Sequence, residues 1–126
     1  MDHPLTPTIS PGSSALLVGT DEVLLYTRKV ILEKHGFTIA IAHPKEMSDR
    51  LNSSPFDVVV ACHTLRQDEA DTLVDAARAR PSAPVLIGFT RQMSPEPSRH
   101  PFDATVWSLS SPETFLDTVH QALVHR

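Results

Sequence analysis

The stretch PFDVVVACHTL, residues 55–65, decides how this chain is expected to fold. Its three consecutive valines and one alanine form a continuous apolar run, which is typical of a strand buried on both faces of a sheet. The turn Pro55-Phe56-Asp57 precedes the run, and polar residues follow it. Cys62 and His63 therefore stand where the predicted strand meets its loop.

Four other apolar segments have the same character, and helical patterns separate most of them. The predicted strands span 14–18, 37–42, 57–61, 84–89 and 104–107. Helices are expected at 20–34, 43–51 and 67–80, and a last helix is expected to begin at 111. Alternation of continuous apolar strands with helices predicts one α/β domain whose parallel sheet is covered on both faces.

The first of these helices has a clear beginning in the sequence. Thr20 is the expected cap, because a hydroxyl can accept from the free N–H groups of the first turn. Leu24, Val30 and Ile31 are the residues expected to face the core.

Composition and charge exclude several classes of function. A chain of 126 residues can bury one core, and its net charge of −4, without a Lys/Arg stripe, argues against nucleic acid as a partner. Its longest apolar runs are about five residues, far short of the roughly 20 that span a membrane. The start, MDHPLTPTISPG, lacks the features of a secretory signal. We therefore expect a disordered lead-in at 1–13, a single domain at 14–126 and a cytoplasmic location.

The single cysteine, Cys62, excludes an internal disulfide and a cysteine-based metal site. Its neighbour His63 could lower the pKa of the thiol, but adjacent residues on a strand point to opposite sides. Packing is therefore the preferred interpretation of Cys62. The segment VGTDE, residues 18–22, has one glycine where a phosphate-binding loop needs several, so no cofactor is expected.

The order and spacing of these segments resemble the receiver domain of CheY-like two-component response regulators. The resemblance covers residues 14–124 and is carried by LLVGTDE, LEKHGFTIAIA, PFDVVVACHTL, APVLIGFT and SLSSPETFLDTV. It implies a three-layer, flavodoxin-like (βα)5 fold with sheet order 2-1-3-4-5 and a site at the carboxyl ends of the strands. The helix between strands four and five is expected to be shortened or lost, because Pro95, Pro97 and Pro101 lie there.

The resemblance also implies an acidic pair after the first strand and an aspartate after the third, and this chain has neither. The acidic pair would hold Mg²⁺ through carboxylate oxygens. Its positions fall on Gly19 and Thr20, so that only the next residue, Asp21, is acidic. The position of the phosphate-accepting aspartate falls on Cys62.

Two further positions implied by the resemblance are also replaced. The hydroxyl that should end the fourth strand falls on Phe89, with Thr90 one residue late. The lysine that should end the fifth strand falls on Ser108. The sequence therefore predicts a degenerate site that holds no metal and runs no aspartyl-phosphate chemistry.

The function expected from this pattern is that of a pseudo-receiver, a non-catalytic and phosphorylation-independent interaction module in bacterial signal transduction. Its partner would be another signalling protein or a second copy, bound through the fifth strand and the last helix. Phe102, Trp107 and Phe115 are the candidate contacts. Two alternatives stay open: a thiol-based redox or ligand sensor that uses Cys62, and a phosphorelay receiver with an unconventional acceptor.

Overall fold

Five parallel strands form the centre of the structure. The computed structural model describes residues 13–62, 64–90 and 102–125. Neighbouring strands are parallel throughout, in the order β2-β1-β3-β4-β5. The strands are β1 (Ser14–Val18), β2 (Thr38–Ala42), β3 (Val58–Ala61), β4 (Val85–Thr90) and β5 (Ala104–Trp107). The predicted fold class and strand order are confirmed.

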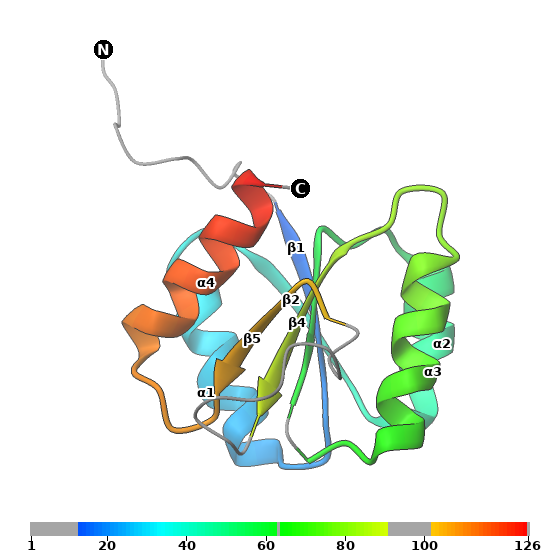
Figure 1. Cartoon of the computed structure of the whole chain (residues 1–126), viewed down its shortest axis with the longest axis horizontal. Coiled ribbons are helices and arrows are strands. Elements are labelled where there is room, and N and C mark those ends of the chain that lie inside the picture. The colour runs from blue at the N-terminus through cyan, green and yellow to red at the C-terminus, as the bar shows by residue number, and fades with distance from the viewer. Residues whose placement is uncertain (1–12, 63, 91–101, 126) are drawn as a thin grey trace.

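Helices cover both faces of the sheet, which gives three layers (Figure 1). One face carries α1 (Glu22–Glu33) and α4 (Pro112–Val124), and the other carries α2 (Met47–Ser53) and α3 (Gln67–Arg78). A short 3-10 turn, η1 (Pro44–Glu46), leads into α2. Proline suits the first position of this turn, because its φ is already fixed near the helical value and its missing N–H is not needed there.

The strands supply apolar side chains to two cores, because successive residues point to opposite faces. The core under α1 and α4 includes Leu17, Val60, Ile87 and Val106 from the strands. The core under α2 and α3 includes Leu16, Val18, Val59, Ala61 and Leu86. Burial on both faces explains why the strands read as unbroken apolar runs.

The beginning of α1 differs from the prediction by one residue. Asp21, and not Thr20, is the cap, and its Oδ1 accepts from the N–H groups of Val23 and Leu24 at 3.1 and 3.2 Å. Thr20 is exposed and lies in the preceding loop. A carboxylate is also stabilised at this position by the positive end of the helix dipole.

The buried face of α1 also differs from the prediction. Leu25, Arg28 and Leu32 are the buried residues of this helix. The predicted inward residues Leu24, Val30 and Ile31 are half-buried, and of these Ile31 packs against the core. The spacing i, i+3, i+7 is that of a core-facing stripe, but an arginine in its middle hides the stripe from a hydrophobicity pattern.

Some predictions fall on residues outside the described ranges. These are the lead-in up to residue 12, His63, and the segment 91–101 in which the helix between strands four and five was expected to be shortened or lost. Ser13 is described, and its carbonyl oxygen accepts from the Thr38 N–H at 2.8 Å. Within the described ranges, no helix is long and apolar enough to span a bilayer.

Candidate functional site at the carboxyl edge of the sheet

The strands bring the predicted site residues to one edge of the sheet. Gly19 follows β1, Cys62 follows β3, Phe89 and Thr90 end β4, and Ser108 follows β5. Backbone hydrogen bonds continue the sheet through these positions: Cys62 N–H donates to the Val18 carbonyl at 3.0 Å, and Ser108 N–H donates to the Thr90 carbonyl at 2.8 Å. We call these five residues the carboxyl rim.

The rim is closed where Gly19 meets Cys62. A Cβ atom at position 19 would lie 2.9 Å from the Cβ of Cys62, a distance that real Cβ atoms essentially never show, and a tight 3.2 Å from its Sγ. The next residue, Thr20, donates its backbone N–H to Oγ1 of Thr64 at 3.2 Å. The loop after β1 therefore lies directly on the loop after β3, and no side chain can project from position 19 without displacing Cys62.

Arg28 reaches the rim from the core side of α1. It is only 5% exposed, and its Nη1 donates to Sγ of Cys62 at 3.2 Å. Its guanidinium carbon lies 3.5 Å from the centroid of the Phe89 ring, within the range of a cation–π contact. The hydrophobic pattern of the sequence does not single out this residue. Its spacing from Leu25 and Leu32 is the signal that could have found it.

The thiol of Cys62 is held in its neutral form by its surroundings. Burial raises the pKa of this thiol above its ordinary value, and the charge and hydrogen bond of Arg28 oppose that effect without cancelling it. The carboxylate of Asp21 adds a smaller effect that also raises the pKa. With its side chain only 3% exposed, Cys62 is protonated at neutral pH and shielded from solvent.

The residues of the rim do not fit Mg²⁺, which prefers several oxygen ligands. Gly19 has no side chain, and Cys62 offers a protonated sulfur. The carboxylate of Asp21 already accepts two backbone hydrogen bonds as the cap of α1. Across residues 13–62, 64–90 and 102–125, no group of three or more His, Cys, Asp or Glu side chains could hold a metal ion.

The predicted interface residues do not share one surface. Phe115 is 3% exposed and packs on Phe89, with ring centroids 5.1 Å apart. Phe102 packs against the opposite core, where its ring lies over Gly88 and leaves no space for a Cβ. Trp107 is half-buried, whereas the unpredicted Leu109, two residues further on, is 76% exposed. Phe115 therefore belongs to the core, because its position on α4 faces the sheet.

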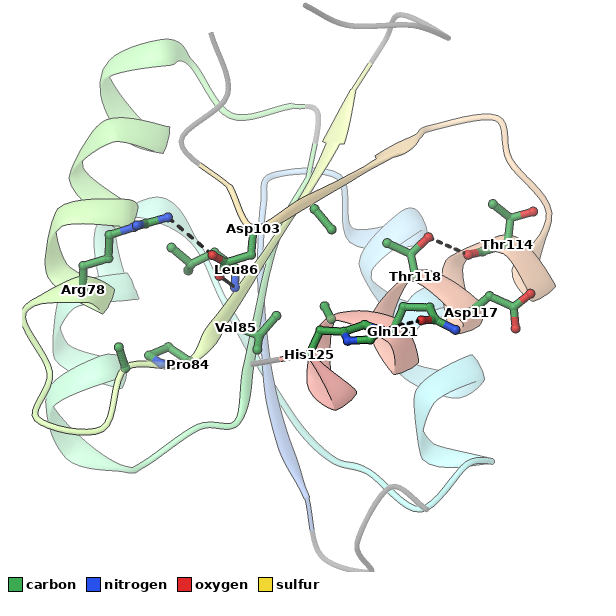
Figure 2. A pocket seen from close by; sticks show the side chains of 13 residues that line it. Arg78, Pro84, Val85, Leu86, Asp103, Thr114, Asp117, Thr118, Gln121 and His125 are labelled. Carbon is green, nitrogen blue, oxygen red and sulfur yellow. Dashed lines mark hydrogen bonds and ion pairs between the residues drawn. The ribbon is translucent and has the colours of Figure 1, made fainter. Parts of the chain in front are cut away.

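An open groove lies towards the other end of the sheet, between the end of α3 and the outer part of α4 (Figure 2). Its volume is about 760 Å³, and β4 and β5 contribute Val85, Leu86 and Ala104 to its lining. Asp103 stands beside these residues, accepts from the Leu86 N–H at 2.8 Å, and pairs with Arg78 at 3.7 Å. We call this hollow the α3–α4 groove.

Comparison with known proteins rests on structure alone. No family model matches the chain, and no curated protein matches its sequence. Among solved structures, the chemotaxis response regulator CheY4 of Vibrio cholerae superposes with a TM-score of 0.78 and 18% identity over 88% of this chain and 98% of that one. The fold is that of a CheY-like receiver domain.

Other receiver domains agree equally well. The CheY-like receiver domain protein from Methanospirillum hungatei JF-1 gives a TM-score of 0.76 at 23% identity, over 90% of this chain and 95% of its own. The receiver domain of the sensor histidine kinase PA1611 from Pseudomonas aeruginosa PAO1 gives 0.76 at 11% identity, over 90% and 98%. That receiver coordinates a magnesium ion in its active site cleft. The receiver fold of the present chain instead has Gly19 packed on Cys62 at the matching edge.

Proposed function

We propose that this chain is a signal-transduction module that acts by binding another protein, without accepting a phosphoryl group and without catalysing a reaction. The receiver fold supports a place in signalling, as in the response regulators that it resembles. The observation that carries the rest of the proposal is the packing of Gly19 against Cys62, which closes the edge where a receiver would bind metal and phosphate.

Phosphoryl transfer depends on positive charge that is placed to neutralise the phosphoryl oxygens, and a bound Mg²⁺ commonly supplies it. Among the residues that the structure describes, Arg28 brings a positive charge to the closed rim, and that charge is buried against Cys62 and Phe89. A phosphoryl group would have to displace these contacts to reach it. The geometry therefore favours a module whose active surface lies elsewhere.

Nucleophilic catalysis by Cys62 is disfavoured for a related reason. A cysteine nucleophile needs a base that removes its proton. The side chain that is hydrogen-bonded to Cys62 is an arginine, which stays protonated and donates only. Cys62 is buried and hydrogen-bonded to Arg28, and so differs from the exposed thiolates that are reactive.

The surface that we propose for the partner is the α3–α4 groove and the adjoining outer face of α4. Its apolar lining, with Val85, Leu86 and Ala104, suits an apolar side chain of the partner. Asp117 is exposed on the α4 side, and no ion pair engages it within the described part of the chain. We therefore propose a signalling protein that places a basic side chain beside Asp117.

The phosphorylation part of the proposal is tested with beryllofluoride and Mg²⁺, which together imitate a phosphorylated carboxylate. Fluorescence of the single tryptophan, Trp107, should stay unchanged at concentrations that saturate a working receiver measured in parallel. Intact mass should also stay unchanged after incubation with acetyl phosphate or phosphoramidate. A saturable, Mg²⁺-dependent fluorescence change would overturn the proposal. Addition of a phosphoryl group to any residue would favour the receiver with an unconventional acceptor.

The interaction part is tested by comparing two charge reversals on exposed helix residues. Asp117→Arg changes the proposed surface, whereas the matched variant Asp75→Arg changes α3 outside the groove. A partner that is crosslinked to the wild-type protein in its own cells should be retained by Asp75→Arg and lost by Asp117→Arg. Equal retention by both variants would exclude the groove as the binding surface. A crosslinked second copy would identify the partner as the chain itself.

A further inference from the structure

Arg28 is a buried cation that lacks the partner such a group normally has. Charged side chains are almost never fully buried unless an opposite charge pairs with them. Arg28 is 5% exposed, yet in the described ranges it forms no ion pair with a carboxylate. Its contacts are the sulfur of Cys62 and the ring of Phe89. Of these two contacts, the thiol of Cys62 is the group that can acquire a negative charge and so pair with Arg28.

We propose that Cys62 is an oxidation site for small hydroperoxides, and that Arg28 binds the anionic sulfur acid that forms there. The sulfur lies 3.2 Å from Nη1, at the distance of a direct hydrogen bond, so a negative charge on the oxidised sulfur group would be neutralised in place. The proposal does not depend on the partner surface. It concerns the closed rim alone.

The reaction balances with hydrogen peroxide as the only oxidant. The thiolate sulfur attacks one peroxide oxygen, an S–O bond forms, the O–O bond breaks, and the products are the sulfenic acid and hydroxide. After the sulfenic acid loses its proton, a second peroxide transfers another oxygen, which gives the sulfinate and water. Each step oxidises the sulfur by two electrons and reduces one peroxide by two. The sulfinate carries the permanent negative charge that Arg28 can bind.

The surroundings of Cys62 determine the rate at which its thiol is oxidised and the size of the oxidant that can reach it. The side chain is 3% exposed, and burial raises the pKa of the thiol, so reaction is slower than at an exposed thiolate. Arg28 acts in the opposite direction, because its positive charge and its hydrogen bond favour the thiolate. The oxidant must be as small as hydrogen peroxide. Bulky thiol reagents should leave the folded protein unmodified.

The site is also in contact with the helix that lines the α3–α4 groove. The ring of Phe89 carries Arg28 on its face and packs on Phe115 of α4 at 5.1 Å between centroids. Oxidation of the sulfur would change the contacts of Arg28. Arg28 is linked to α4 through the ring of Phe89, which packs on Phe115.

Peroxide titration of the whole chain, followed by peptide mass spectrometry and thermal unfolding, tests the inference. Wild type should add one and then two oxygens at Cys62, and the oxidised protein should melt at or above the temperature of the reduced one. In Arg28→Met, oxidation should be about tenfold slower, because the positive charge and the hydrogen bond that favour the thiolate are lost. Oxidation of this variant should also lower its melting temperature. The matched variant Arg66→Met removes an exposed arginine and should behave as wild type.

Two results would overturn the inference. One is a folded wild-type protein whose Cys62 stays unoxidised at peroxide doses that fully oxidise the urea-unfolded chain. The other is an equal rate and an equal shift in melting temperature for Arg28→Met and Arg66→Met. If Arg28→Met does not fold, Arg28→Lys replaces it, since it keeps the charge but not the planar fork of donors. It should then bind the sulfinate less well, and a melting shift on oxidation equal to that of wild type would count against the inference.

Discussion

The carboxyl rim and the α3–α4 groove are built in opposite ways, although both lie at the sheet of one small domain. At the rim, the loops after β1 and β3 touch, Gly19 has no space for a Cβ, and the guanidinium of Arg28 is buried. At the groove, helices stand apart around about 760 Å³, and the charged pair Arg78–Asp103 is about half exposed. The rim is therefore a packed region, and the groove is the region open to a ligand or partner.

The difference shows that one receiver-like scaffold can be tightly packed at one end of its sheet and open at the other. The receiver sheet order is intact. At its carboxyl edge, Arg28 from α1 places a guanidinium nitrogen 3.2 Å from Sγ of Cys62. Substitutions at the rim should therefore be strongly coupled to one another, whereas substitutions at the groove should act separately and weakly.

The largest expected effect is the coupling between positions 62 and 28. Cys62→Asp places a carboxylate beside Arg28 and should be tolerated, because the two opposite charges pair. In an Arg28→Met background the same carboxylate is buried alone, and the substitution should cost about 3–5 kcal/mol more in the free energy of unfolding. Urea unfolding of wild type, the two single variants and the double variant measures this coupling.

The control for this cycle is Thr20→Asp, which adds a carboxylate in an exposed loop. Its effect should be the same in both backgrounds to within about 0.5 kcal/mol. If the effects of the substitutions at positions 62 and 28 are also additive, the two side chains do not interact. Arg28 would then not be the cation that neutralises a charge at position 62.

A smaller effect is expected for a single methyl group at the point of closure. Gly19→Ala puts a Cβ 2.9 Å from the Cβ of Cys62, and overpacking of this kind costs about 1–3 kcal/mol. In a Cys62→Gly background the two closest obstructing atoms are gone and Oγ1 of Thr64, 3.3 Å away, remains, so the same alanine should cost less, about 0.5 kcal/mol. Denaturant midpoints of the four proteins give the comparison. An alanine tolerated in the wild-type protein would show that the rim is open.

The smallest effect is expected at the groove. Arg78→Gln removes a 3.7 Å ion pair whose two side chains are about half exposed, and exposed pairs contribute about 0–1 kcal/mol to stability. The melting temperature should change by a few degrees at most, and the response of Cys62 to peroxide should be unchanged. A loss above about 2 kcal/mol would mean that the groove is as tightly packed as the rim.

The sequence by itself determined the arrangement of the sheet and the residues that reach its carboxyl edge. Continuous apolar runs predicted β1 at Ser14–Val18 and β5 at Ala104–Trp107 with the observed bounds. Strand order and the placement of Cys62 followed from the resemblance to receiver domains, and both agree with the structure. The bounds of β1 and β5 are visible in sequence because burial on both faces leaves a local, unbroken pattern.

Only the tertiary structure decided what the edge contains and which aromatic residues are exposed. The contact between Arg28 and Cys62 joins residues 34 positions apart, and that between Gly19 and Cys62 joins two loops. Phe102 and Phe115 were grouped by sequence proximity to β5, but they pack on opposite faces of the sheet. Such contacts depend on side-chain direction and on the crossing of distant elements, and a local pattern of hydrophobicity carries neither.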